Sequence, residues 1–263
     1  MRFPSPFLVG EGGVAVFADS HLGQVEGDGE DFLTALGGLP GRGFSTVVLL
    51  GDVFQYLVGD RKFETPLIRR VLVGLEELAA RGVRFRYVEG NRDFFVARSP
   101  FARPFAAYGL TDGVAVGSKR YAFVHGDRVN TRDLPYRFWR VLSKNPVSYA
   151  VMKLLPGSVA RAVVAGTEAR LYRTNFKHKS RLPVAHLREE GRRARLAGYD
   201  EVLVGHFHVD WVDAGPDGVV RVLPAWLEER RHAEIDPDGT LRLVEEPTAG
   251  RARPRAAAPA VPG

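Results

Sequence analysis

Histidine, aspartate and asparagine recur along this chain in five short motifs, and most of them stand next to glycine. Imidazole, carboxylate and amide groups are ligands that divalent ions such as Mn²⁺, Fe²⁺ and Zn²⁺ accept. Two such ions, about 3.5–4 Å apart, can activate a hydroxide and stabilise the attacking and leaving oxygens of phosphate ester hydrolysis. The motifs are Asp19-Ser20-His21, Gly51-Asp52-Val53-Phe54, Gly90-Asn91-Arg92-Asp93, His125-Gly126-Asp127 and Gly205-His206-Phe207-His208.

Each motif follows an apolar run that is typical of a buried or half-buried strand. In layered α/β folds, ligands collect at the carboxyl ends of the strands, so five such ends can converge on one point. A single Gly-His or Gly-Asp at a turn is more often structural, but the ordered set of five predicts a metal site. The predicted strands are Val14–Ala18, Thr46–Leu50, Val83–Val88, Tyr121–Val124 and Val202–Val204.

Helices and hairpins fill the intervals between these strands. Thr65-Pro66 is typical of a helix start, and Gly82 of a helix end, with one apolar stripe between them. A second, charge-rich helix is predicted over residues 184–197. After it we expect strands at Trp211–Ala214 and Val219–Trp226, with turns at 216–218 and 236–239.

The composition indicates one α/β domain over residues 1–247, followed by a tail at 248–263 that we expect to be disordered because Arg, Ala and Pro dominate it. The chain has no cysteine, which excludes disulfides, thiolate ligands and cysteine nucleophiles. No stretch approaches the roughly 18 apolar residues of a spanning helix, and the N-terminus lacks a signal-peptide core. We therefore expect a cytoplasmic protein.

Residues 128–182 differ from the rest of the chain in charge and pattern. They hold twelve Lys or Arg and two acids, a net charge of +10, within a chain of net charge +6. Their apolar residues predict helical faces interrupted by Pro146 and Pro156, so we expect a helical insertion. The charge suits a phosphate-bearing ligand or a plain solvated surface, and the apolar faces suit a lipid or the core of a helical subdomain.

The order and spacing of the five motifs resemble those of the calcineurin-like metallophosphoesterases. The resemblance implies an α/β fold, a β-sandwich flanked by helices, here with a helical lid insertion at about 128–182. It also implies that Asp19, His21, Asp52 and His208 hold one ion, and that Asp52 bridges to a second ion. The ligands of that second ion would be Asn91, His125 and His206.

The third motif, Asn91-Arg92-Asp93-Phe94, is similar to that of the UDP-2,3-diacylglucosamine pyrophosphohydrolases of lipid A biosynthesis. An arginine cannot act as a general acid near neutral pH, but its planar guanidinium suits phosphate binding. The continuation of the second motif to Asp60 and the helical segment are also similar. The last motif departs from the family's Gly-His-Thr-His-Arg-Pro, since Phe207, Val209 and Asp210 replace Thr, Arg and Pro.

This resemblance implies hydrolysis of a lipid-linked nucleotide diphosphate to UMP and a lipid sugar 1-phosphate. Two divalent ions, Mn²⁺ by expectation, would be the cofactors. The partner would be the inner membrane, contacted peripherally from the cytoplasmic face, and no nucleic acid is expected. The reacting groups would be a hydroxide that bridges the metals, with Asp52, Asn91 and Arg92. The substrate contacts would be Arg92, Asp133, Asn175, Lys177 and Lys179.

Two other functions fit parts of the pattern. A phosphodiesterase or pyrophosphatase acting on soluble nucleotides or nucleic acid would use the basic charge equally well. A non-catalytic scaffold would keep the fold, but such proteins typically lose ligands and this chain has all seven. Three histidines outside the motifs, namely His178, His186 and His232, are expected to be structural or exposed.

Overall fold

The computed structural model describes residues 2–164, 166 and 182–246. The strands form two six-stranded mixed sheets and one two-stranded pair. The sheet that we call the β2 sheet has the order β14 (Leu241–Glu245), β13 (Arg231–Ile235), β2 (Gly13–Phe17), β3 (Phe44–Leu49), β5 (Arg84–Val88) and β7 (Phe105–Gly109). The β9 sheet has the order β1 (Phe7–Leu8), β8 (Thr111–Val116), β9 (Lys119–Val124), β10 (Glu201–Val204), β12 (Gly218–Val222) and β11 (Trp211–Gly215). The pair is β4 (Leu57–Val58) with β6 (Asp93–Phe94).

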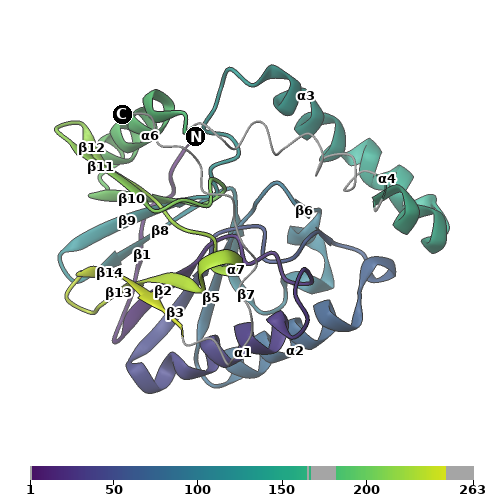
Figure 1. Ribbon diagram of the computed structural model, residues 1–263, viewed down its shortest axis with the longest axis horizontal. Helices are drawn as coiled ribbons and strands as arrows, with labels where there is room; N and C mark the ends of the chain where they lie inside the picture. The colour runs from purple at the N-terminus through teal and green to yellow at the C-terminus, as the bar shows by residue number, and fades with distance from the viewer. Residues whose placement is uncertain (1, 165, 167–181, 247–263) are drawn as a thin grey trace.

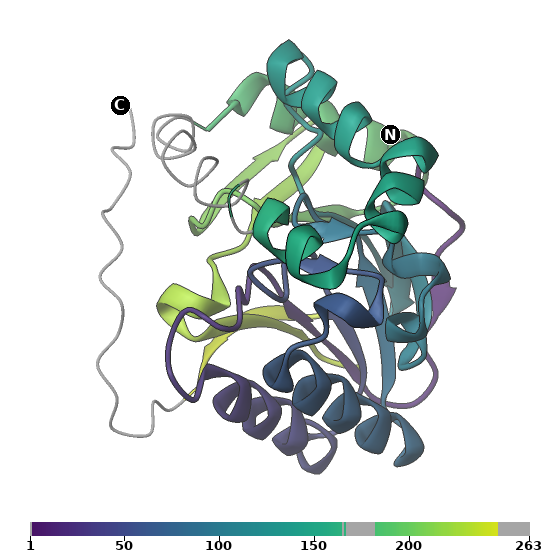
Figure 2. The ribbon, with the colours of Figure 1, turned by 90° about the vertical axis from the view of Figure 1, so that its right-hand side faces the viewer.

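The two sheets pack face to face, with helices on their outer faces (Figure 1). Helices α1 (Asp28–Gly38) and α2 (Pro66–Ala80) lie side by side under the β2 sheet, and α6 (Val184–Leu196) covers the β9 sheet (Figures 1 and 2). Four 3₁₀ turns occupy connecting segments; they are Pro40–Arg42, Arg61–Phe63, Val96–Arg98 and Pro100–Ala102. This four-layer arrangement is the flanked β-sandwich that the motifs predicted.

The alternation of side chains along each strand builds three apolar layers. In β2, Val14 and Val16 pack between the sheets, whereas Ala15 and Phe17 face α1 and α2. In β9, Phe123 points to the inner layer and Ala122 to the layer under α6. Because both faces of these strands are covered, they read as nearly continuous apolar runs in the sequence. The five predicted strands before the motifs are therefore all present.

Two predicted elements differ from the structure. The expected strand over Val219–Trp226 ends at Val222, since Pro224 has no N–H for a ladder, and the chain then forms the short helix α7 (Trp226–Glu229). Pro146 does not interrupt a helix but starts one, with Asn145 as its N-cap. Helix α1, strands β1, β7 and β8 were not predicted, and the glycines of α1 weaken its pattern.

Helices α3 (Leu134–Ser143) and α4 (Pro146–Leu154) stand apart from the sandwich (Figures 1 and 2). We call residues 134–154 the α3–α4 segment. None of its residues is buried, although Met152 packs against a small apolar cluster of Val58, Phe63 and Ala160. In the part of the chain that the structure describes, no helix has both the length and the apolar character needed to cross a bilayer.

Candidate metal centre

The predicted ligands lie at the carboxyl ends of parallel strands. Strands β2, β3 and β5 run parallel in one sheet, and β9 and β10 run parallel in the other. Each of the five strands ends one or two residues before its motif, so the motifs meet at one edge of the sandwich. The β2 sheet supplies Asp19, His21, Asp52 and Asn91, while the β9 sheet supplies His125, His206 and His208.

Asp19 is the centre of this cluster. Its Oδ1 lies 3.3 Å from Nε2 of His208 and 3.7 Å from Nε2 of His21, and these two nitrogens are 3.3 Å apart. A second group combines Asp19 with Asp52 and His125, and the ligand atoms within each group lie within 4.8 Å of one another. Asp19 is thus shared by both groups, whereas the sequence prediction made Asp52 the bridging residue, and that role stays a prediction.

The other two predicted ligands adjoin His125. Oδ1 of Asn91 lies 3.1 Å from Nε2 of His125, and Asp52 Oδ2 lies 3.6 Å from the same nitrogen. The ring of His206 packs edge-on against the ring of His125, with centroids 5.1 Å apart. The backbone N–H of His206 donates to Asp19 Oδ2. All seven predicted ligands therefore gather in one region.

The hydrogen bonds of two histidines direct lone pairs into the cluster. Nδ1 of His125 lies 2.9 Å from the carbonyl oxygen of Leu50, and Nδ1 of His208 lies 3.1 Å from a carboxylate oxygen of Glu228. Both partners can only accept, so in a neutral ring Nδ1 carries the hydrogen and Nε2 presents its lone pair. Among the residues that the structure describes, none donates a well-directed hydrogen bond to the buried Oδ1 of Asp19. When these rings are neutral, their Nε2 lone pairs face carboxylate and amide oxygens, an arrangement that fits a divalent cation.

The charges of the cluster reinforce one another. Burial alone would raise the pKa of Asp19, but in the metal-free protein the positive charge of protonated His208, His125 and His21, with a hydrogen bond from His208, outweighs it and lowers that pKa below its usual range. Burial lowers the pKa of His125. The charges of the Asp52 and Asp19 carboxylates raise it by more, so the net shift of the His125 pKa is upward. Asp19 is therefore a carboxylate at neutral pH, as a ligand requires.

Backbone strain concentrates on the same residues. Five predicted ligands have positive φ, a conformation that costs side-chain-bearing residues about 1 kcal/mol or more each. Of the other described non-glycine residues, only Phe95 and Arg230 share it. The angles are 51° for Asp19, 42° for His21, 51° for Asp52, 70° for His206 and 55° for His208.

Comparison with known proteins identifies the family. No protein-family model matches the chain. A curated protein from Pseudomonas putida KT2440, named UDP-2,3-diacylglucosamine hydrolase, is 30% identical over 199 residues, which cover 74% of this chain and 81% of that protein. A protein of the same name from Azotobacter vinelandii DJ is 36% identical over 115 residues, 43% of this chain and 47% of that protein.

The chain belongs to the UDP-2,3-diacylglucosamine hydrolase family. Its fold is that of the calcineurin-like metallophosphoesterases, as the motifs predicted. A solved structure, the hypothetical protein PH1004 from Pyrococcus horikoshii OT3, matches with a TM-score of 0.50 and 13% identity over 89% of this chain and 87% of that chain. A predicted phosphoesterase from Streptococcus pneumoniae TIGR4 has a TM-score of 0.42 and 16% identity, with coverages of 92% and 95%.

Arg92, which pointed to this family, lies against the metal cluster. Its backbone N–H donates to Asp52 Oδ1 at 2.8 Å, and its Nε lies 3.7 Å from Asp52 Oδ2. Its Nη1 donates to the carbonyl oxygen and to the side-chain oxygen of Gln55, at 2.9 and 3.1 Å. Gln55 comes from the continuation of the second motif, so this family feature orients the guanidinium beside the cluster.

The other predicted substrate contacts have different outcomes. The carboxylate of Asp133 accepts the backbone N–H of Tyr136 at 3.0 Å and so caps helix α3, and its contact with substrate stays a prediction. Asn175, Lys177 and Lys179 lie outside the described residues, as do His178 and the predicted tail at 248–263. His232 is buried and stacks on Phe17, which agrees with a structural role.

Two supporting carboxylates had no role assigned from sequence. Asp93 is fully buried and accepts the backbone N–H groups of Gly90 and Asp52 and the hydroxyl of Tyr87, thereby joining the second and third motifs. Burial, followed by the charge of Asp52, raises the pKa of Asp93 to about 6. Glu228 holds the ring of His208, as outer-shell carboxylates do for metal-binding histidines. Asp93 stands in the third motif and Glu228 lies two residues after the strand predicted to end at Trp226, but their hydrogen bonds depend on contacts that only the fold creates.

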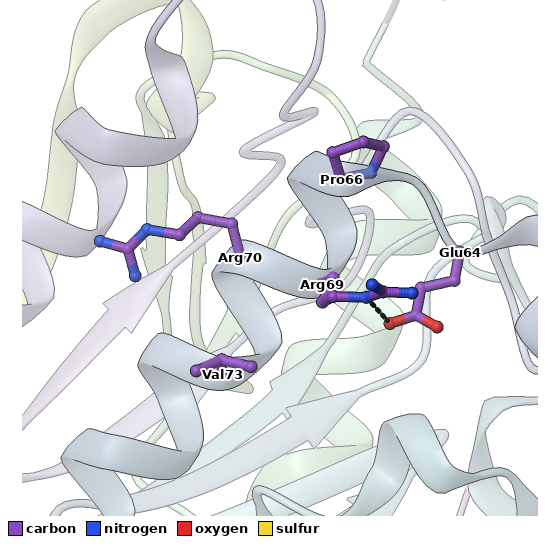
Figure 3. Close-up of a pocket in the computed structure, with 5 residues that line it drawn as sticks. All are labelled: Glu64, Pro66, Arg69, Arg70 and Val73. Atoms are coloured by element: carbon purple, nitrogen blue, oxygen red, sulfur yellow. Dashed lines mark hydrogen bonds and ion pairs between the residues drawn. The ribbon is translucent and has the colours of Figure 1, made fainter.

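A separate pocket lies on helix α2 and shares no residue with the cluster (Figure 3). Its cationic side chains are already paired, Arg69 with Glu64 at 2.9 Å and Arg70 with Glu30 at 2.8 Å. The figure shows Arg69 turned toward Glu64 and Arg70 extending from α2 in the opposite direction. We assign no function to this pocket.

Glycines in the motifs allow close approach of neighbouring side chains as well as sharp turns of the backbone. Among the glycines before Asp52, Asn91 and His206, only Gly51 has positive φ, 78°. A Cβ on Gly90 would lie 2.2 Å from Asp52 Oδ1, and one on Gly205 would lie 2.8 Å from Asp19 Oδ2. Gly90 and Gly205 therefore let neighbouring ligands approach the backbone closely.

We expect Gly90→Ala to lower the free energy of unfolding by about 1–3 kcal/mol, because the added methyl overpacks a site that Asp52 already fills. The matched control is Gly37→Ala in helix α1, where a Cβ meets nothing within 4 Å, and which should raise stability by up to about 1 kcal/mol. Urea unfolding followed by tryptophan fluorescence measures both changes. Equal effects of the two substitutions would contradict the steric explanation.

Proposed function

We propose that this protein hydrolyses the diphosphate of UDP-2,3-diacylglucosamine, or of a similar lipid-linked nucleotide, to UMP and a lipid sugar 1-phosphate. The observation that carries the proposal is the gathering of seven ligand-type side chains beside Arg92 in a chain that is related to hydrolases named for this substrate. Either feature alone would support only a phosphoesterase.

The proposal assigns two divalent ions, with Mn²⁺ as the preferred metal, to the cluster. Asp19, His21, Asp52 and His208 hold one ion. Asp52, Asn91, His125 and His206 hold the other. The imidazole, carboxylate and amide donors suit Mn²⁺, and the close approach of Asp19 Oδ1 to two imidazole nitrogens supports a cation between them. When bound, such a pair supplies an activated water and stabilises charge on the phosphate oxygens.

The chain's own reacting groups are Asp52, Asn91 and Arg92. Arg92 keeps its charge at neutral pH, so it neutralises the diphosphate and cannot serve as the acid that protonates the leaving group. Gln55 fixes one edge of its guanidinium. The Arg92 backbone N–H binds Asp52 Oδ1, which keeps the carboxylate and the guanidinium at a constant spacing. Arg92 thereby orients the phosphate that is attacked.

The α3–α4 segment supports a lipid-linked substrate rather than a soluble one. Large apolar side chains are exposed along it, including Phe138 at 71% and Leu154 at 85%. Contiguous exposed apolar surface on a protein commonly marks a site of interaction with an apolar partner. Lys153, a cationic residue of the same stretch, favours an anionic head group or membrane surface. We therefore propose that this surface also contacts the inner membrane peripherally, from the cytoplasmic face.

Incubation with UDP-2,3-diacylglucosamine in mixed micelles with Mn²⁺ should release UMP. Chelation should abolish the reaction, and Mn²⁺ should restore it. Asp52→Asn should reduce kcat by at least about 100-fold, because charge stabilisation worth several kcal/mol is lost. Chromatographic quantification of UMP measures each rate.

Two controls separate the alternative functions. Faster cleavage of a dinucleotide or of a UDP-sugar without acyl chains would favour a phosphoesterase of soluble nucleotides. Absence of UMP, together with no transition metal in elemental analysis, would favour a non-catalytic scaffold.

Neutralising Glu228 should weaken the cluster through His208. With Glu228→Gln, the side chain no longer stabilises the Nδ1–H tautomer as strongly, and we expect metal affinity or kcat to fall about 10- to 100-fold. The adjacent Glu229 binds Arg231 instead, so Glu229→Gln is the matched control and should change affinity less than about twofold. Mn²⁺ titration by calorimetry measures both. Equal losses in the two variants would exclude the proposed role of Glu228.

Membrane contact is testable by sedimentation with vesicles of phosphatidylglycerol and phosphatidylethanolamine. Phe138→Glu and Leu154→Glu should each weaken vesicle binding about tenfold, since each removes apolar burial worth roughly 1.5 kcal/mol. Leu196, 74% exposed at the end of α6, provides the control, and Leu196→Glu should bind as the unaltered protein does. If all three substitutions weakened vesicle binding equally, the added negative charge, and not the loss of an apolar contact, would be the cause.

A further inference from the structure

A compact group of charged side chains joins helix α3 to the sandwich. Arg140 donates to Asp127 Oδ2 at 2.6 Å and to Glu89 Oε1 at 3.2 Å. Lys144, one helical turn later, donates to Glu89 Oε1 at 2.7 Å and to the carbonyl oxygen of Gly90 at 2.6 Å. The side chains of the four charged residues are at most 16% exposed. Removal of one partner from such a group leaves an uncompensated charge, which is strongly unfavourable.

The acceptors of these bonds belong to two ligand-bearing loops. Glu89 and Gly90 directly precede Asn91, and Asp127 lies two residues after His125. Asn91 and His125 are themselves in contact, with Asn91 Oδ1 at 3.1 Å from His125 Nε2. Helix α3 therefore spans the two loops whose side chains meet at one half of the cluster. The Asp19, His21 and His208 group receives its support elsewhere, as the bond from His208 to Glu228 of α7 shows.

The third motif and an additional lysine hold the rest of the α3–α4 segment. The ring of Phe95 packs on the ring of Tyr149 in α4, with centroids 4.7 Å apart, and Lys144 lies 5.2 Å from the ring of Phe94. Lys62 donates to the carbonyl oxygens of Met152, Lys153 and Leu155, where α4 ends. A cation at this point satisfies orphan carbonyls and complements the helix dipole. The segment is thus fixed at both ends.

We propose that Arg140 and Lys144 are positioning residues for the Asn91 and His125 half of the metal centre, and that they couple this half to the α3–α4 segment. The inference rests on the proposed function, in which Asn91 and His125 hold an ion. Coupling between two sites is reciprocal. A ligand of the α3–α4 segment that changes the ion affinity at Asn91 and His125 would therefore have its own affinity changed by the same factor when an ion is bound there. Lipid binding and metal loading are then linked through four side chains.

Mn²⁺ titration calorimetry of the full chain tests this asymmetry. Arg140→Gln and Lys144→Met should each weaken one of two binding events about 10- to 100-fold, in the range of other outer-shell changes, and leave the other within about twofold. Arg137→Gln is the matched control, because Arg137 lies on the same helix and binds only the Thr131 carbonyl among the bonds described for it. It should leave both events unchanged. Equal weakening of both events, or of neither, would overturn the proposal.

A conservative variant and a metal-free measurement separate positioning from loss of fold. Arg140→Lys keeps the positive charge and should bind Mn²⁺ nearly as well as the unaltered protein. If only the size of the side chain mattered, Arg140→Met would bind Mn²⁺ equally well. In the metal-free protein, hydrogen exchange of the amides at 89–91 should accelerate in Arg140→Gln, with no change at 19–22. Unaltered exchange at 89–91 would overturn the proposed link. If the unaltered protein binds no ions, the proposed function fails, and the exchange data still decide whether α3 supports these loops.

Discussion

A carboxylate removed from water needs positive charge close by, and Asp19 is the residue on which this constraint falls most heavily. Asp19 is fully buried. One of its oxygens accepts the backbone N–H of His206, and the other faces His21 and His208. Imidazoles whose lone pairs are turned inward do not satisfy that oxygen by themselves. The strand ends, the strained backbone and the glycines that admit close contacts all serve to bring electron-rich atoms together. A bound cation would stabilise such a cluster, whereas without one the buried carboxylate raises the free energy of the folded state.

Much of this centre was predictable because it depends on local order along the chain. Each ligand follows a strand, parallel strands end at one edge, and side chains at that edge meet. The residues that orient the ligands were not predictable in the same way. Asp93, Glu228 and Gln55 each act through a partner that is remote in sequence, and any polar residue near a motif is an equal candidate. The same limit applied to the start of α7, because Trp226 closes an apolar run that resembles a strand but contains Pro224.

The glycines of the motifs meet two different steric demands. Gly51 has a positive φ and lets the chain turn sharply before Asp52. Gly90 has an ordinary backbone and is needed because Asp52 occupies the place of its missing side chain. Steric demands of this kind come from the neighbouring strand, so no pattern within one motif reveals them. They follow only from the register of the two strands.

The cluster takes its donors from both halves of the sandwich. Asp19, Asp52 and Asn91 extend from the β2 sheet, and His125, His206 and His208 extend from the β9 sheet. An ion shared among them would act as a further cross-link between two layers that are joined by apolar packing and by hydrogen bonds such as that between His125 and the Leu50 carbonyl. Because a ligand that binds only the folded chain adds its binding free energy to stability, the closure of the sandwich and the capture of metal would form a single cooperative event. Such a protein would complete its folding at the place where it does its chemistry.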